Sequence, residues 1–211
     1  MMGIAVRQEV DLWLRHWQAT IAVIFLLLVP AGTASAKDAI DRAEQWFNNL
    51  KTITADFVQI ASDGTAAKGK LQFLRPARMK ISYEDTAPLN LITTPIWLHI
   101  DRPDERTIVS YPLSETPLSL ILAETVSLRP AGYTTRLAPR RAGVISVEIS
   151  KDRGDDAGRL TLEFSEKPFA LRRWIIVDSA GIETAVTLQN AVYDKAMDIS
   201  LFRVPTYESN N

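Results

Sequence analysis

Few side chains in this sequence have the chemistry of a catalytic or metal-binding site. The chain has no cysteine, which excludes thiol catalysis, disulfide bonds and thiolate metal ligands. Its two histidines are His16 and His99, and His16 falls in a predicted export signal. A serine–histidine–aspartate triad would therefore have to use His99, but we interpret His99, in the segment IWLHID, as a half-buried histidine of a strand. Because no G-x-S-x-G motif accompanies it, the sequence predicts a protein that is not an enzyme.

An acidic loop is the one place where a bound cation could be considered. The segment KDRGDDAGR, residues 151–159, holds three aspartates beside two glycines. These carboxylates could bind Ca²⁺ weakly, but their spacing fits no EF-hand loop, and we interpret the segment as the solvated tip of a hairpin. The P-loop and G-x-G-x-x-G phosphate-binding motifs are also absent from the sequence. We therefore predict no metal ion and no cofactor.

The overall charge excludes a further class of partner. Twenty-four lysines and arginines stand against 25 aspartates and glutamates, which gives a net charge of -1. Nucleic-acid-binding surfaces need a basic excess, so no nucleic-acid partner is predicted. The same balance argues against stable electrostatic docking on an anionic membrane.

Arg75 is the charged side chain in the most unexpected position. It lies in GKLQFLRPARMKISY, residues 69–83, where Leu71 and Phe73 alternate with polar residues. Side chains two apart share one face of a strand, so Arg75 continues the apolar row. A buried guanidinium is costly unless its donors are hydrogen-bonded. Arg75 must therefore find acceptors inside, extend to water, or pair with an acid such as Glu84.

The elements that position these residues are mostly strands. After residue 50 the hydrophobic period is two almost everywhere, which indicates about eleven β-strands. They are joined by short turns, and this excludes βαβ crossovers. We predict a single, strongly curved antiparallel sheet in a mainly β fold.

Two helices complete the predicted fold. The first runs over Asp38–Leu50, with Asp38 as its N-cap. The second lies in SETPLSLILAETVSL, residues 114–128, with Thr116 as the cap and Pro117 in the first turn. This second helix is short and apolar almost all round, although it stands inside an all-β pattern.

A sheet of this size has more apolar face than two short helices can cover. Eight strands closed into a barrel already leave room for a small ligand, so a wider curl should enclose a hollow. Each single residue of the apolar rows could equally be ordinary core. The candidates for the wall of a lipid-binding cavity are Leu71, Phe73, Met79, Ile81, Tyr83, Trp97, Leu118, Ile121 and Leu122.

The N-terminus has the features of an export signal. The run ATIAVIFLLLV, residues 19–29, is apolar apart from Thr20, and small residues follow at 34–36. Eleven residues fall short of the ~20 that span a bilayer. We therefore predict a cleaved signal peptide over residues 1–36 rather than a membrane anchor. The 211 − 36 = 175 remaining residues, 37–211, would form one soluble periplasmic domain.

The order of these features resembles the LolA-type periplasmic carriers of outer-membrane lipoproteins. The segment ITADFVQ is similar to the F-x-Q strand of that family, and GKLQFLRPARMKISY is similar to its glycine- and R-P-containing strand pair. The residues that match these two motifs are Phe57, Gln59, Gly69, Arg75 and Pro76.

The resemblance extends to the rest of the chain with two departures. TPLSLIL is similar to the interior lid helix of the family, and LFRVP, residues 201–205, to its terminal strand. However, TTPIW stands where the family often has an Asp-Gly turn. The long extension that follows the terminal strand in some carriers is absent before Asn211, and this bears on acceptor docking and cargo retention.

The resemblance implies both a fold and a function. The fold is an unclosed half-barrel of about eleven strands, with an N-terminal helix and a short interior helix as the lid. Arg75 is implied to reach backbone carbonyls of the lid and hold the empty cavity shut, unless it snorkels to water or pairs with Glu84.

The implied function is a monomeric periplasmic carrier of acylated lipoproteins. It would receive them from an ATP-driven lipoprotein-releasing complex of the inner membrane and deliver them to an outer-membrane lipoprotein acceptor. A carrier of free lipid or glycolipid, and a periplasmic lipid-sensing domain, remain the alternatives.

Overall fold

The computed structural model describes residues 33–84, 87–139, 141–151 and 158–207. The chain divides into two units, Met1–Ser35 and Ala36–Asn211. The second unit contains the whole sheet and the segments that cover it.

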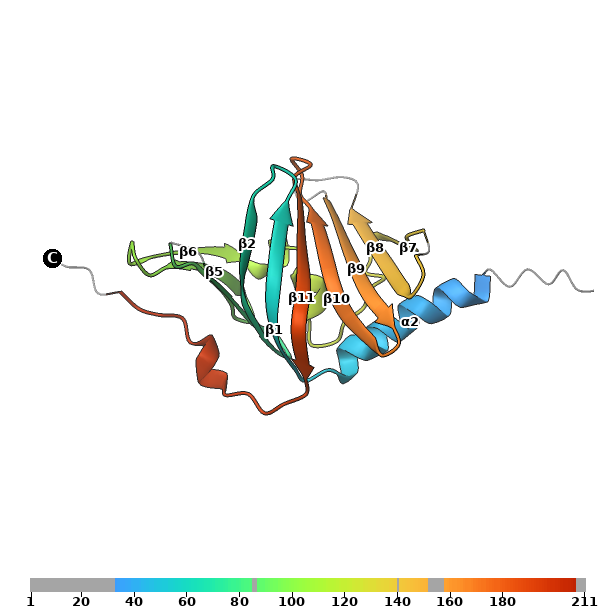
Figure 1. Cartoon of the computed structure of the whole chain (residues 1–211), viewed down its shortest axis with the longest axis horizontal. Coiled ribbons are helices and arrows are strands. Elements are labelled where there is room, and N and C mark those ends of the chain that lie inside the picture. The colour runs from blue at the N-terminus through green and yellow to red at the C-terminus, as the bar shows by residue number, and fades with distance from the viewer. Residues whose placement is uncertain (1–32, 85–86, 140, 152–157, 208–211) are drawn as a thin grey trace, which may run out of the picture. The chain divides into compact units, whose positions relative to one another are not determined.

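Eleven strands form a single antiparallel sheet in the order β6-β5-β4-β3-β2-β1-β11-β10-β9-β8-β7. Each pairs with a neighbour in sequence, except in the centre, where β1 pairs with β11 (Figure 1). The described strands leave β6 and β7 as separate edges, so the sheet is not closed. This confirms the predicted half-barrel of eleven antiparallel strands. The strands are β1 (Thr52–Ala61), β2 (Ala66–Leu74), β3 (Arg78–Tyr83), β4 (Asn90–Thr93), β5 (Trp97–Arg102), β6 (Thr107–Pro112), β7 (Thr134–Leu137), β8 (Val144–Lys151), β9 (Gly158–Glu166), β10 (Phe169–Val177) and β11 (Glu183–Tyr193).

The two faces of the sheet differ as strand alternation requires. On β1, Ile53, Ala55 and Phe57 are buried, whereas Thr54 and Asp56 between them are exposed or half-buried. The register places Leu71 and Phe73 of β2 opposite Ala55 and Ile53, so the apolar rows of neighbouring strands coincide. We call this apolar side the inner face and the opposite side the outer face.

Helix α2 (Thr33–Asn49) covers the part of the inner face formed by β8–β10 (Figure 1). It buries Ile40, Ala43 and Phe47. Aromatic contacts fix its position: the Trp46 ring lies edge-on to Phe164 of β9, with 5.5 Å between ring centroids, a geometry that stabilises beyond the area buried. In the part of the chain that the structure describes, no helix is long and apolar enough to cross a bilayer.

Both predicted helices need corrections at their ends. Helix α2 begins at Thr33, so Asp38 lies inside it and the prediction that it is the N-cap is wrong; alanine-rich sequence before it allows the helix to extend. The second helix is only one turn, α3 (Ser119–Leu122), preceded by the 3-10 turn η1 (Leu113–Glu115). Thr116 does not cap α3, because its hydroxyl donates to the Leu113 carbonyl.

The segment after β11 crosses the outer face. It contains the 3-10 turn η2 (Ile199–Phe202) and lies near β3. It is the red strand-free stretch in Figure 1. Phe202 is buried on this side, and so is Ile92 of β4, whose register partner is the outward-facing Lys80. Further along, the Tyr207 hydroxyl donates to the Asp101 carboxylate at 2.6 Å. The outer face is therefore partly covered as well.

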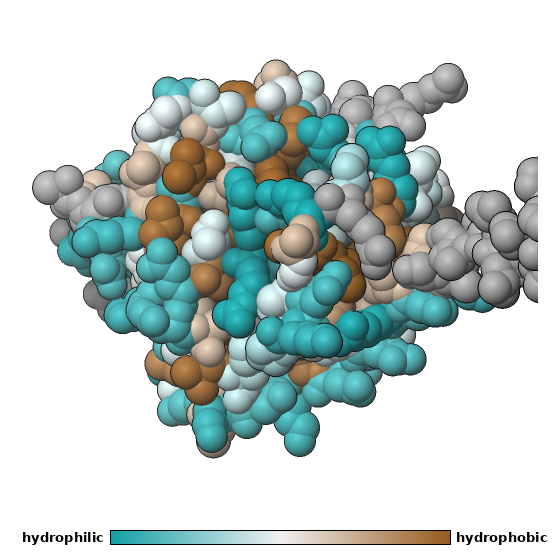
Figure 2. All heavy atoms as spheres, turned by 45° about the vertical axis from the view of Figure 1, so that its right-hand side comes forward, coloured by the Kyte–Doolittle hydropathy of each residue, from teal (hydrophilic) through white to brown (hydrophobic). Residues whose placement is uncertain are grey.

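Figure 2 turns the β7–β8 edge toward the viewer and shows hydrophilic side chains over most of this side, with separate hydrophobic patches between them. Cross-strand ion pairs account for part of this polar surface. Arg136 of β7 pairs with Glu148 of β8, and Arg141 pairs with Glu163 of β9. These pairs lie on the outer face and leave the inner face apolar.

Gly69 permits the close contact between β2, β3 and β1, which gives a test of the fold. A Cβ at position 69 would lie 2.0 Å from the Ser82 carbonyl oxygen and 2.9 Å from Phe57 Cε1. We expect Gly69→Ala to lower the free energy of unfolding by about 1–3 kcal/mol, the usual cost of overpacking, as measured by urea denaturation. Gly64→Asn is the control, because Gly64 has φ +87° with open space around it and asparagine tolerates that conformation. An equal loss in both variants would contradict the packing argument.

Candidate functional site

The inner face carries a plug, residues 113–125, which comprises η1, α3 and the turn that follows. Its apolar side chains insert against the sheet, and Leu113, Leu118, Ile121 and Leu122 are between 1% and 8% exposed. Eight of the nine predicted cavity residues gather here. Leu71, Phe73, Met79 and Ile81 form one buried cluster with Leu118, Ile121 and Leu122, and Tyr83 packs at its margin.

Trp97 does not belong to this group, and this corrects the prediction. The register runs from Ile81 through Leu91 to Ile100 on the inner face. Trp97 is three residues before Ile100 and therefore points to the outer face, where it is 43% exposed. Leu98 takes the inner position instead and packs against the core. The inward-facing positions of β5 are therefore shifted by one residue from the prediction, because the turn at 94–96 determines which residue of β5 first faces inward.

The plug covers the part of the inner face that the sequence predicted as the wall of a hollow. Its side chains and those of β2 and β3 are buried against one another there. Any ligand of the inner face must take the place of the plug side chains. We call the part of the inner face that the plug covers the seat; in this structure the plug itself occupies it.

Arg75 holds the plug against the sheet. Its Nη1 donates to the Ile121 carbonyl at 3.2 Å, and its Nη2 donates to the Glu124 carbonyl at 2.8 Å. These carbonyls stand at the end of α3, where a helix leaves acceptors without intrahelical partners. The backbone N–H of Ala77, in the same β2–β3 turn, donates to the Leu122 carbonyl at 3.0 Å. Three carbonyls at the end of the plug are thus bound from one turn of the sheet.

The surroundings of Arg75 show why these bonds matter. Burial lowers the pKa of Arg75 from its ordinary value, but an arginine starts so high that it stays charged at neutral pH. A charged group with part of its water removed needs acceptors. The alternative partner, Glu84, lies 3.9 Å from Lys70 instead. The Ile121 and Glu124 carbonyls of the plug supply acceptors, and Nη2 also donates to Asn48 Oδ1 of α2 at 3.5 Å.

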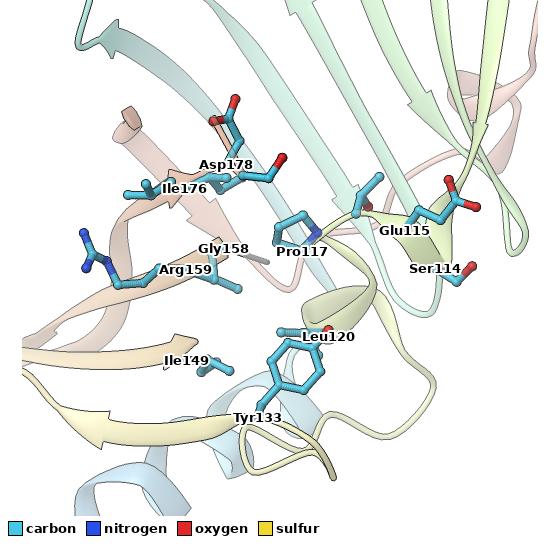
Figure 3. Close-up of a pocket in the computed structure, with 14 residues that line it drawn as sticks. Ser114, Glu115, Pro117, Leu120, Tyr133, Ile149, Gly158, Arg159, Ile176 and Asp178 are labelled. Carbon is cyan, nitrogen blue, oxygen red and sulfur yellow. The ribbon is translucent and has the colours of Figure 1, made fainter. Parts of the chain in front are cut away.

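A small pocket adjoins the plug (Figure 3). It encloses about 150 Å³ between the plug, Tyr133 and the ends of β8–β10. Pro117 and Leu120 enter it from the plug and face Tyr133, Ile149 and Ile176 across it, whereas the Arg159 guanidinium points away. The pocket is smaller than the roughly 300 Å³ at which ligand sites begin, and it opens directly beside α3.

The sequence prediction missed this pocket. Its walls include Leu120 of the plug and Ile149, Leu160 and Ile176 of β8–β10. The period of two predicted the strands but gave these residues no role. The only signal was Leu120, which adds apolar surface off the main stripe of the second helix. Which strand ends meet the plug depends on long-range pairing, and no local pattern encodes it.

The polar groups that could suggest catalysis are bound in other ways. His99 Nδ1 lies 2.8 Å from Ser110 Oγ on the outer face, and burial lowers the pKa of His99. Asp101, two residues along, accepts from Tyr207 and Asn90 rather than from His99. The three residues therefore do not form a triad. Within the described ranges no cluster of three or more metal-ligating side chains occurs; the acidic loop falls largely outside them.

Comparison with known proteins assigns the chain to a family. Residues 48–205 match the family described as outer membrane lipoprotein carrier protein LolA, which covers most of the chain, so the protein belongs to this family. The description of the family names its members as carriers of outer-membrane lipoproteins. No curated protein matches the sequence.

Comparison with solved structures finds similar chains at low identity. An uncharacterised conserved protein from Thermus thermophilus is 11% identical, with a TM-score of 0.50 over 80% of this chain and 93% of that one. A LolA superfamily protein from Nitrosomonas europaea is 10% identical, with a TM-score of 0.43 over 80% and 97%. A DUF1329 family protein from Desulfovibrio piger is 10% identical, with a TM-score of 0.48 over 79% and 96%. At such identity the Thermus structure supports the fold alone.

Proposed function

We propose that this protein carries the acyl chains of lipoproteins on the inner face of its sheet, in the space that the plug now fills. The observation that supports this most directly is the plug itself. A single helical turn with buried apolar side chains occupies the seat, and a few hydrogen bonds at its end fasten it. Apolar ligands could replace such a segment without unfolding the sheet.

The free energies of burial favour an exchange, in which an acyl chain replaces the plug side chains, over a permanently open cavity. Each buried CH₂ contributes about 0.8 kcal/mol, so one sixteen-carbon chain gives on the order of 12 kcal/mol. Leu118, Ile121 and Leu122 each contribute about 1.5–3 kcal/mol when buried. Loading therefore trades one apolar contact for another, and the net affinity stays modest. A carrier that must pass its cargo on without ATP requires such a balance.

The route of entry follows from the pocket beside α3. It is lined by apolar side chains that include Leu120 of the plug, and Arg75 is not among its lining residues. An acyl chain that enters there would displace the plug and break its hydrogen bonds to Arg75. Loaded and empty states would then be two populations whose balance the cargo shifts.

The proposed cellular path has three steps. The protein is exported by the signal peptide at 1–36, receives acylated lipoproteins from an ATP-driven releasing complex of the inner membrane, and delivers them as a monomer to an outer-membrane acceptor. The domain 37–211 performs these steps. Free lipid or glycolipid as cargo, or a lipid-sensing role, would be revealed by what the purified protein carries.

Export gives the first test. We expect the protein recovered from the periplasm to begin at Lys37, which intact-mass measurement will show. The helix breaker Pro30 and the small residues at 34–36 place the cleavage site there. A periplasmic form that retains residues 1–36 would contradict the proposal.

Cargo transfer is tested by release from spheroplasts. Purified residues 37–211 should bring labelled lipoprotein into the soluble fraction, and native mass spectrometry should find one lipoprotein per protein. Ile176→Trp, which fills the pocket beside α3, should reduce the release about tenfold or more. Ile175→Trp is the matched control, because Ile175 is the next residue of β10 and its register partners Thr161 and Ala185 place it on the outer face. Free lipid in place of lipoprotein would support the alternative cargo, and equal release by both variants would refute the entry route.

Arg75 should control unloading rather than uptake. In Arg75→Leu the plug loses two bonds from a charged donor, each worth about 1.5–3 kcal/mol when shielded and less at an exposed edge. The empty state is then less stable, so we expect uptake to persist and transfer to acceptor membranes to slow by about tenfold. Arg78→Leu is the control, because the recorded hydrogen bond of Arg78 reaches only the nearby Pro76 carbonyl. If Arg75→Leu transferred cargo at the wild-type rate, the proposal that Arg75 holds the plug closed would be contradicted.

A further inference from the structure

The residues that follow the plug are held by a different element. We call Val126–Arg129 the root of the plug. The Asn48 side chain of α2 accepts from the Val126 N–H at 2.8 Å and donates to the Val126 carbonyl at 3.0 Å. One carboxamide thus binds both polar groups of one residue, as a neighbouring strand would. One turn earlier, Glu44 Oε1 accepts from the Leu128 N–H at 2.7 Å.

The same face of α2 also binds the end of the root. Arg129 Nη1 lies 2.7 Å from Asp41 and 3.4 Å from Glu44, and its Nη2 donates to the Lys37 carbonyl at 3.2 Å. Positions 41, 44 and 48 are spaced to lie on one side of a helix. The main chain from 126 to 129 is therefore fastened along several turns of α2.

A short exposed stretch lies between the buried side chains of the plug and those of the root. Val126 is 2% exposed and Leu128 is 0% exposed, so both side chains are locked into the core beneath α2. The residues just before them, 123–125, are exposed. Among them, the Glu124 carbonyl accepts from Arg75 Nη2, and the preceding Leu122 carbonyl accepts from the Ala77 N–H. The hydrogen bonds to the β2–β3 turn thus end at residue 124, and those to α2 begin at residue 126.

We propose that Asn48 and Glu44 are positioning residues that keep the root fixed as a hinge while the plug swings out. This inference rests on the proposed function, because it describes how the acyl-chain seat opens. The plug detaches from Arg75 and Ala77, turns about residues 125–126, and remains tied to α2. Because the plug stays tethered close to the inner face, it can return to the same position by a short intramolecular movement.

Hydrogen exchange followed by NMR can locate the hinge, because separate amides report the two attachments. The Ala77 N–H bonds to the plug, whereas the Val126 and Leu128 N–H groups bond to α2. In Arg75→Leu without any ligand, we expect Ala77 to lose protection by about tenfold while Val126 and Leu128 keep theirs. Loss of protection at all three amides would overturn the hinge, since the root would then open with the plug.

The clamp itself is tested by a neighbouring pair of asparagines. Asn48→Ala should speed exchange at Val126 by about tenfold in the empty protein. Asn49→Ala should not, because within the described residues the Asn49 side chain has no recorded hydrogen bond. Asn48→Asp keeps the acceptor for the Val126 N–H and should restore most of its protection, which a general loss of helix stability would not allow. Unchanged exchange in Asn48→Ala would refute the role of Asn48.

A synthetic diacylated lipopeptide separates the two proposals. If it binds by native mass spectrometry and only Ala77 loses protection, both the seat and the hinge are supported. If it binds and Val126 and Leu128 also lose protection, the hinge is wrong while the carrier proposal stands. If it does not bind, the carrier proposal fails, and the ligand-free exchange of Arg75→Leu still decides whether the root is fixed.

Discussion

The structure depends on one constraint, which is that an open sheet must cover its apolar face. A barrel buries that face by closing on itself, but here β6 and β7 remain separate edges. The inner face therefore needs segments from outside the sheet. Helix α2 covers one part with aromatic packing, and the plug covers another with a single turn of helix. The two covers differ in length: α2 has 17 residues, whereas α3 of the plug has four.

The weakness of the plug is a consequence of its length. A four-residue helix has no stability of its own, because nucleation fixes several residues for a single hydrogen bond. Its conformation is maintained by what it touches. The apolar side chains supply most of this, and the carbonyls that one turn leaves unbonded become acceptors for Arg75 and Ala77. The short length of α3 makes it unstable in isolation. It also leaves the carbonyl groups to which Arg75 and Ala77 of the β2–β3 turn bind.

Much of this arrangement could be predicted from sequence, because alternation is a local property. The rows at Leu71, Phe73, Met79 and Ile81 follow from a period of two, and the position of Arg75 on that row raised the need for acceptors. Trp97 shows the limit: parity is reset at each turn, and a shift of one residue sends a side chain to the other face. Three features could not be predicted, because each joins segments far apart in the sequence. They are the position of the plug on the inner face, the pocket beside α3 and the contacts of Asn48.

The junction between α2 and β1 connects the covers of both faces. Lys51 accepts from the Arg75 N–H through its carbonyl, and its own N–H donates to Asp194 at 2.7 Å. The Thr52 hydroxyl donates to the Lys195 carbonyl at 2.7 Å, where the chain turns onto the outer face. Asp194 adopts φ +55°, a conformation that aspartate tolerates better than most residues. Lys51 and Thr52 therefore connect three parts of the molecule. These are the β2–β3 turn that contains Arg75, helix α2 that binds the root, and the segment after β11 on the outer face. The bonds of this junction use the backbone of Lys51 and the side chain of Thr52 rather than the plug carbonyls, so the proposed movement of the plug would leave them intact.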